Sequence, residues 1–268
     1  MPRHDNIDSG RENDWSKTSE DYAEHRPGPP ESFYRRLKVM GVGTPDQRIL
    51  DLGTGTGHLA RSFAKQGCRV AGIDIAVGQI EAAKKLARDQ GVDVDFRVAP
   101  AEQTTHPNTS FDAITANQCL LYFDLPRAIA EMRRVLRPGG EIMISHFTPL
   151  PRLDSFVAAC EELVLKHNPD WSAADWSGHI PTHPTWSRDA FDMPCFFYYD
   201  EPIPFTHASW RGRMRAHRGV AASLSSKEVA SFDADLSTLL EQTMSPEFTV
   251  LHRLHVQIFR FKSEPHPQ

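Results

Sequence analysis

The amino-acid sequence predicts an α/β protein with a doubly wound, mostly parallel β-sheet. Between residues 48 and 147, short apolar runs alternate with segments of helical periodicity, and the connectors are short. Such alternation is typical of a parallel sheet with helices on both faces. The first apolar run ends in the glycine-dense turn Gly53–Gly57, and the second ends in the acid Asp74. A tight strand-to-helix turn beside a strand-end carboxylate favours ligand binding.

Five strands are expected in this half of the chain, at Arg48–Leu52, Arg69–Ile75, Val94–Val98, Phe111–Ala116 and Glu141–Phe147. Three helices are expected between them, at His58–Gln66, Gly78–Gln90 and Pro126–Leu136. The second helix ends at Gly91, because a glycine commonly ends a helix in the left-handed conformation. The third ends before Pro138, since proline cannot continue a helix and the two glycines after it permit a reversal.

Beyond Thr148 the alternation stops. Helices are expected at Leu153–His167, His207–Arg218 and Lys227–Gln242, around a loop over Asn168–Asp192 that is rich in Pro, Trp and His. A strand is expected at Cys195–Tyr199, and Phe248–Phe261 alternates like a closing strand or a hairpin pair.

Size and charge restrict the class of protein. A chain of 268 residues with 40% hydrophobic residues can form one α/β domain with additions, or at most two small domains. The apolar runs are of strand length and the N-terminus is polar, so neither a membrane span nor a secretory signal is expected. A net charge of −5 without a dense Lys/Arg tract makes nucleic acid a poor partner. The expected state is a monomer or homodimer.

Cysteine and histidine spacing argues against a metal site. The four cysteines are scattered without C-x-x-C spacing, which indicates reduced thiols of a cytoplasmic protein. His179 and His183 are four residues apart, but Pro181 and Pro184 break any helix that would align them. No metal is expected.

The glycine turn has two possible ligands. Its glycines let backbone N–H groups approach a ligand closely, and Asp74 can accept hydrogen bonds from two ribose hydroxyls. A site for a nicotinamide or flavin dinucleotide typically has the glycine pattern G-x-G-x-x-G. Here the position of the third glycine holds His58, and Gly57 comes one residue early.

The turn, the acid Asp51 before it and Asp74 after it resemble the S-adenosylmethionine (SAM) loop of the class I, Rossmann-like methyltransferases. Two further segments resemble that family: the L-x-P-G-G turn ending at Gly140, and Phe111–Gln118, which is similar to the fourth strand whose end faces the transferring methyl. The resemblance is to the small-molecule branch and covers roughly Trp15–Thr148. It implies a seven-stranded sheet with an antiparallel last strand, and SAM as cofactor with S-adenosyl-L-homocysteine as product.

The resemblance also implies a domain organisation in which a mainly helical lid is inserted in the C-terminal half. The expected parts are a flexible tail (1–14), a SAM-binding core (15–148), lid segments (149–192 and 206–244), closing strands of the core sheet (193–205 and 245–262) and a second tail (263–268).

Individual cofactor contacts follow from the resemblance. The methionine half of SAM is expected at Asp51, Gly53, Thr54, Gly55 and Gly57, the ribose at Asp74 and the adenine at Ile75. Proline stands at position 100, where the family often has an acid at the adenine edge, so Ala101 or Glu102 is expected to make that contact. Asn117 is a further cofactor candidate. Tyr22 and Arg26 resemble an N-terminal segment that folds over SAM, although a proline-rich linker has the same composition.

The acceptor side is expected at the ends of the fourth and fifth strands and on the lid. His146 and Gln118 are the catalytic candidates, and Tyr122, Trp210, Arg211 and Arg215 are the substrate-binding candidates. Arg211, Arg215 and Arg218 are spaced to share one helix face, which suits an anionic substrate, although a solvated surface is the commoner outcome for such a run of charges. A strand-end histidine serves as a base or as a structural group.

The sequence therefore predicts a SAM-dependent methyltransferase that moves a methyl group to an O, N or C atom of a small organic acceptor, by in-line displacement with a lid closing over the site. A non-catalytic SAM-binding regulator on the same scaffold is the alternative, since cofactor motifs can outlive catalysis. Methyltransferases that act on exocyclic amines of nucleic-acid bases or on glutamine side chains commonly carry Asn/Asp-Pro-Pro-aromatic after the fourth strand. This chain has Asn117-Gln118-Cys119 there instead, so those substrates are disfavoured.

Overall fold

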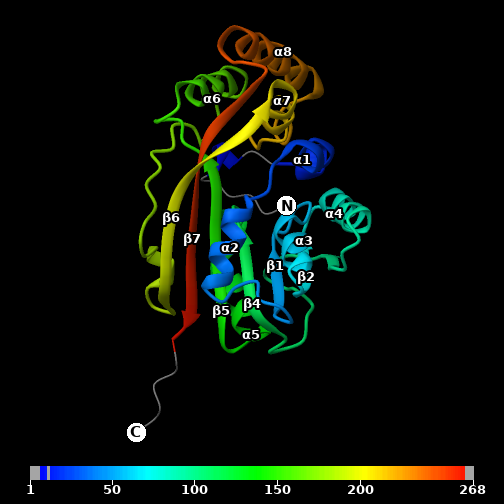
Figure 1. The fold of residues 1–268 in the computed structure, drawn as a ribbon, viewed down its shortest axis with the longest axis vertical. Coiled ribbons are helices and arrows are strands. Elements are labelled where there is room, and N and C mark those ends of the chain that lie inside the picture. Colours follow the sequence, from blue (N-terminus) through cyan, green and yellow to red (C-terminus); the bar gives the residue numbers. More distant parts are fainter. Residues whose placement is uncertain (1–6, 11–12, 263–268) are drawn as a thin grey trace.

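The computed structural model describes residues 7–10 and 13–262, which contain one seven-stranded sheet. The strands lie in the order β3-β2-β1-β4-β5-β7-β6 (Figure 1). Their bounds are β1 (Arg48–Leu52), β2 (Arg69–Asp74), β3 (Asp95–Val98), β4 (Phe111–Asn117), β5 (Leu136–Pro149), β6 (Phe191–Thr206) and β7 (Glu247–Phe261). Strands β1 to β5 pair in parallel, whereas β7 is antiparallel to both β5 and β6. The predicted fold class is confirmed.

Helices cover both faces of the sheet, because successive side chains of a strand point to opposite faces. Ile49 of β1 belongs to a core with α2 (Glu31–Val39), α3 (His58–Lys65) and α4 (Val77–Asp89). Leu50, its neighbour, belongs to the second core, which includes α5 (Leu125–Val135). Near-continuous burial along β1 is what a parallel strand covered on both faces requires.

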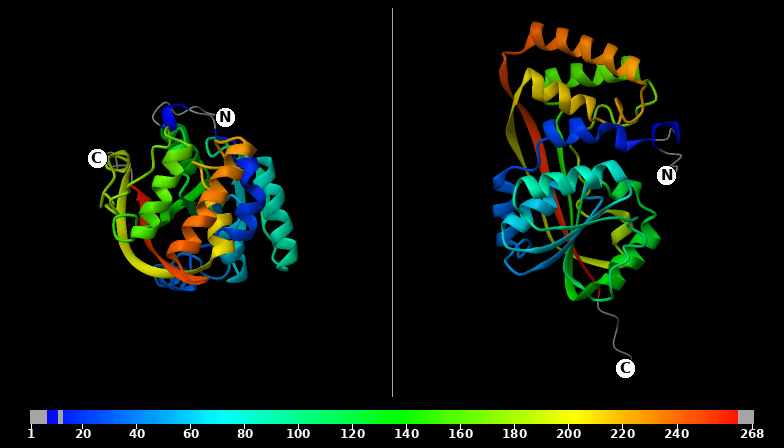
Figure 2. Two further views of the ribbon diagram at one scale, coloured as in Figure 1. Left: turned by 90° about the horizontal axis from the view of Figure 1, so that it is seen from above. Right: turned by 90° about the vertical axis from the view of Figure 1, so that its right-hand side faces the viewer.

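A helical layer lies at the carboxyl ends of the parallel strands. It consists of α6 (Ser155–His167), α7 (His207–Arg215) and α8 (Ser226–Thr243), at the top of Figure 1. Helix α1 (Ser19–His25) lies between this layer and the sheet domain and contacts both α7 and α4, as the right-hand view of Figure 2 shows. The N-terminal segment is thereby placed over the strand ends.

Several boundaries differ from the sequence expectation. Strand β5 begins at Leu136, so Pro138–Gly140 form an irregular strand start, with a register shift opposite Phe111 and Ala113. Strand β6 is much longer than the expected Cys195–Tyr199, because it pairs with β7 along nearly its whole length. β7 is one strand rather than a hairpin pair. Helices α1 and α2 were not anticipated; both are short and mostly polar.

Part of the expected N-terminal tail is docked against the fold. Residues 1–6 and 11–12 lie outside the described residues, but the side chain of Asp8 is fully buried. One oxygen of Asp8 accepts hydrogen bonds from the backbone N and the Oγ of Ser172, and the other lies 3.0 Å from Nε of Arg218. The description of 1–14 as a flexible tail is thus corrected for Asp8, whose carboxylate has charged and polar partners that its sequence neighbours do not reveal.

Within the described ranges, no helix is both long enough and apolar enough to cross a membrane.

Candidate active site

The glycine turn and Asp74 are joined by a backbone hydrogen bond. The N–H of Gly55 donates to Oδ2 of Asp74 at 3.0 Å, and the N–H of Ala76 donates to Oδ1 at 2.9 Å. Gly53, Gly55 and Gly57 all have positive φ, between 54° and 80°, which glycine adopts without steric cost. Burial raises the pKa of Asp74, although these N–H groups lower it in part. Each carboxylate oxygen keeps further acceptor capacity for a ligand.

A cavity of about 170 Å³, here called the first cavity, lies at the ends of β1, β2 and β4. Nine predicted cofactor residues line it: Tyr22, Arg26, Gly53, Gly55, Asp74, Ile75, Ala101, Glu102 and Asn117. A Cβ atom added at Gly55 would lie in ordinary van der Waals contact, 3.7 Å from the Tyr22 ring and 3.8 Å from Gln79, so close packing does not require a glycine here. Of the lining residues that were not predicted, Ala99 and Pro100 belong to the segment expected at the adenine edge, and sequence reasoning missed Trp15, Gln79, Cys119 and Phe123. They come from segments without a recognisable motif.

Three of the predicted cofactor residues do not line the first cavity: Asp51, Thr54 and Gly57. Asp51 is 3% exposed and accepts hydrogen bonds of 2.6 Å from the hydroxyls of Thr54 and Thr115. Burial raises the pKa of Asp51 to about 6, despite these two hydrogen bonds. A Cβ at Gly57 would come within 2.5 Å of the Phe96 ring, so this glycine permits close packing of the turn.

Asp51 and Thr54 instead line a side cavity of about 30 Å³, together with Arg26, His58 and Gln118. Burial lowers the pKa of His58 to about 4, which keeps it neutral there at pH 7. The side cavity shares Tyr22, Gly53 and Asn117 with the first cavity, so the two are adjacent. A carboxylate and a guanidinium therefore lie beside the glycine turn.

Gln118 lines the first cavity, the side cavity and a second cavity that lies between the strand ends and the helical layer. Its Oε1 accepts from Nη2 of Arg26 at 3.0 Å, and its Nε2 donates to Oγ1 of Thr148 at 2.8 Å. The residue has a φ of 58°, an uncommon backbone conformation for a non-glycine residue. Arg26 also lies over the ring of Tyr22, with its Cζ 4.7 Å from the ring centroid. These contacts connect the N-terminal segment to the end of β4.

A second cavity of about 240 Å³ lies between the strand ends and the helical layer. It shares Trp15, Arg26, Gln118 and Tyr122 with the first cavity, so the predicted Tyr122 lies between the two.

His146 lines the second cavity from β5. Its Nδ1 lies 3.2 Å from Nε2 of His255, and the two rings are stacked with centroids 4.7 Å apart. Burial lowers the pKa of His146 to about 4 and that of His255 to about 3. Both rings are therefore neutral at pH 7, and a neutral ring nitrogen can accept a proton.

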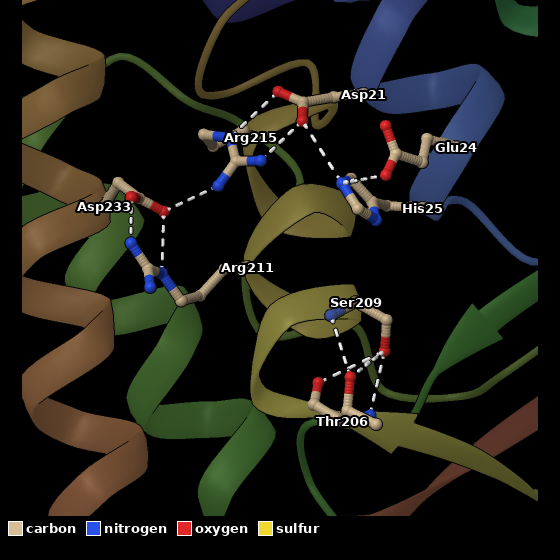
Figure 3. A network of polar contacts seen from close by, with 8 residues as sticks. All are labelled: Asp21, Glu24, His25, Thr206, Ser209, Arg211, Arg215 and Asp233. Atoms are coloured by element: carbon tan, nitrogen blue, oxygen red, sulfur yellow. Dashed lines mark hydrogen bonds and ion pairs between the residues drawn. The ribbon is translucent and has the colours of Figure 1, made fainter.

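The three predicted residues of α7 do not act as a group. Trp210 is fully buried and packs against Phe156 and Phe205, and it contributes to the wall of the second cavity. Arg211 forms an ion pair with Asp233 of α8, and Arg215 pairs with both Asp233 and Asp21 (Figure 3).

Neither Arg211 nor Arg215 lines any of these cavities, so the structure corrects their placement at the substrate site. Carboxylates on α1 and α8 draw their guanidinium groups away from it. Arg213 and Arg218 line the second cavity instead, and Arg218 lies beyond the end of α7. Sequence reasoning missed Arg213, because helix periodicity alone does not say which face of α7 meets the cavity, and it missed Trp171, Trp176 and His217, which lie outside the helices and strands.

Across the described part of the chain, no group of three or more His, Cys, Asp or Glu side chains is arranged to hold a metal ion.

The sheet order, with the glycine turn and the first cavity at the strand ends, is that of the Rossmann-like methyltransferase fold. Residues 50–144 match the family model "Methyltransferase domain". The demethylmenaquinone methyltransferase of Renibacterium salmoninarum is 33% identical over 138 residues, 51% of this chain and 56% of that protein. The ubiquinone biosynthesis O-methyltransferase of Hahella chejuensis is 33% identical over 127 residues, 47% of this chain and 53% of that one. The chain spans about half the length of these curated relatives.

Solved structures extend the likeness in fold to most of the chain. A protein from Anaeromyxobacter dehalogenans, described as a candidate type II methyltransferase, has a TM-score of 0.59 at 24% identity, covering 87% of this chain and 96% of that one. YcgJ from Bacillus subtilis has a TM-score of 0.51 at 20% identity, covering 87% and 100%. At these identities the likeness shows the fold alone. Residues 50–144 thus resemble a methyltransferase domain, and the fold of the chain around them agrees with that likeness.

Proposed function

We propose that this protein transfers a methyl group from SAM to an O, N or C atom of a small organic acceptor. The observation that carries the proposal is the convergence of the glycine turn and Asp74 on the first cavity, next to a second cavity with which it shares Gln118 and Tyr122. The two relatives described above are named as quinone-pathway methyltransferases, which supports a small-molecule acceptor.

The residues around the first cavity fit SAM. Gly55 lines the cavity without a side chain, which permits close approach of a ligand to the backbone, and the Asp74 carboxylate has acceptor capacity for the two ribose hydroxyls. Ile75, which is 42% exposed, offers apolar surface to the adenine. Asp51 and Arg26, in the side cavity, complement the ammonium and the carboxylate of the methionine part. When bound, SAM supplies an electrophilic methyl group on a sulfonium.

The chain's own contribution is alignment, exclusion of water and acceptance of a proton. Gln118 and Tyr122, at the junction of the cavities, orient the acceptor. The segments 149–192 and 206–244 act as the lid that keeps water from the acceptor. His146 accepts a proton from acceptors that lose one, and its hydrogen bond to His255 holds the ring in place.

Two measurements test this function. Titration calorimetry of the full chain should give micromolar binding of both SAM and S-adenosyl-L-homocysteine. Incubation with methyl-labelled SAM and a small-molecule metabolite extract should then transfer label to a metabolite. Binding without transfer to any metabolite would favour a SAM-binding regulator, and failure to bind either nucleoside would refute the proposal.

A further inference from the structure

Arg213 is a buried cation in the second cavity without an acidic partner. Its side chain, on α7, is 8% exposed and lines the cavity. Among the residues that the structure describes, no carboxylate lies within 4.0 Å of its guanidinium, whereas Arg211 and Arg218 each have one and Arg215 has two. Its own contacts are weak: Nη1 lies 3.5 Å from Sδ of Met214, and Cζ lies 4.9 Å from the Trp210 ring centroid.

A buried guanidinium without an acidic partner lowers the stability of the folded protein. Burial lowers the pKa of Arg213 to about 9, with the nearby Arg26 as a further cause. A buried charge normally has a partner, because desolvation of an uncompensated ion is unfavourable. A guanidinium that faces a cavity obtains such a partner when an anion binds there, and its fork of N–H donors matches a carboxylate in geometry.

The other charges around the second cavity leave Arg213 available for an anion. Arg218 is already paired with Asp8, and Arg26 donates to Gln118. Glu161 also lines the cavity and attracts Arg213 electrostatically without forming an ion pair with it, and its Oε2 accepts from the backbone N–H of Asp175. The cationic side chains on the wall therefore outnumber the acidic ones.

The walls of the same cavity are aromatic. Trp15, Trp171, Trp176 and Tyr122 all line it. Aromatic side chains offer large, rigid apolar surfaces on which a flat molecule can pack.

We propose that the methyl acceptor is an organic acid whose carboxylate pairs with Arg213 while its flat apolar part packs among these aromatic rings. The inference rests on the proposed function in placing the acceptor in the second cavity. It goes further in assigning a chemical class to that acceptor and a specificity-determining role to Arg213.

The experiment compares acids with their neutral amides. Benzoate, phenylacetate and indole-3-acetate are each paired with the corresponding amide, and binding to the full chain is measured by ligand-observed NMR with and without S-adenosyl-L-homocysteine. For at least one pair, the acid should bind wild-type protein at least tenfold more tightly than the amide. Arg213→Gln should abolish that preference. The matched control Arg137→Gln, which removes a surface guanidinium paired with Asp112, should retain it.

A thermal melt separates a binding role from a structural one. Since Arg213→Gln removes a buried charge without an acidic partner, its Tm should equal or exceed that of wild type. A Tm more than about 5 °C lower would identify a structural cation and overturn the inference. Acids and amides binding wild type equally, or neither binding, would also overturn it, as would a preference that survives in Arg213→Gln. Failure of wild type to bind SAM would refute the proposed function instead, while the measurement without S-adenosyl-L-homocysteine still decides the anion site.

Discussion

Arg215 of α7 forms a two-point ion pair with Asp21 of α1, with Nε–Oδ2 and Nη2–Oδ1 distances of 2.9 and 2.5 Å (Figure 3). The same guanidinium contacts Asp233 of α8 through Nη1 at 2.9 Å. Helix α1 carries Tyr22, which lines the first cavity, so this network connects one wall of the first cavity to the helical layer. Arg211 and Arg215, which were predicted from the sequence to bind the substrate, therefore connect helices instead.

Replacing Arg215 with Gln should lower stability and weaken SAM binding, because α1 loses its attachment to α7. Both partners are partly exposed, so we expect about 1 kcal/mol, or roughly 2–4 °C in Tm. The loss should be larger at 20 mM than at 500 mM NaCl, since salt screens exposed charges. Arg211→Gln, which breaks only the contact with α8, should leave SAM affinity unchanged; equal losses in both variants would contradict a specific role for the α1 contact.

Replacing Asp74 with Asn should weaken SAM binding by at least tenfold, because the amide keeps only one of the two acceptor oxygens for the ribose hydroxyls. Titration calorimetry measures the effect. Asp89→Asn, on the surface of α4, is the matched control and should bind SAM as wild type does. Native affinity in Asp74→Asn would mean that this carboxylate does not hold the ribose.

Gly55→Val should abolish SAM binding beyond detection by filling the space beside the turn. Gly91 has a similar positive φ, 63° against 54°, and no atom within 4 Å of an added Cβ. Gly91→Val therefore carries comparable backbone strain without touching the cavity. Melting curves should show similar destabilisation in both variants, and calorimetry should show a loss of SAM affinity in Gly55→Val alone.

SAM affinity should depend on pH through Asp51. Its pKa of about 6 in the folded protein exceeds the ordinary 3.8, so the stability it contributes is present below pH 3.8 and is lost as the pH rises through 6. Binding of the ammonium group needs the ionised form, so affinity should rise about tenfold between pH 5 and 7. Asp51→Asn should bind weakly at both pH values; a wild-type affinity without pH dependence would argue against contact with the ammonium.

His146 should contribute to turnover rather than to cofactor binding. His146→Gln should cut the methyl-transfer rate tenfold or more and leave SAM affinity intact. Because the pKa of His146 is lowered to about 4, its ring stays neutral above pH 5 and its protonation should reduce the rate only below that pH. A wild-type rate that falls between pH 8 and 6 in step with one ionisation, and does not do so in His146→Gln, would contradict this pKa.

The fold was predictable from sequence because its signals are local. Alternating apolar runs place β1 to β4 within about two residues of their observed bounds, and the glycine turn with Asp74 identifies the ligand-binding edge. The lengths of β5 and β6 were not predictable, because antiparallel pairing with β7, more than a hundred residues after the start of β5, extends them. Pairing with a strand that is distant in the sequence leaves no periodic pattern of residues within β5 or β6 from which their lengths could be predicted.

The amino-acid sequence by itself determined the half of the site around the glycine turn, since the positive φ of Gly55 and the position of Asp74 depend on residues within one strand–turn–helix–strand unit. Only the tertiary structure decided which arginine of α7 faces the second cavity. The three candidates in that helix have the same charge and lie within five residues. Asp21 on α1 and Asp233 on α8 draw Arg211 and Arg215 outward, and Arg213 is left on the buried side. That choice depends on which helices pack on either side of α7.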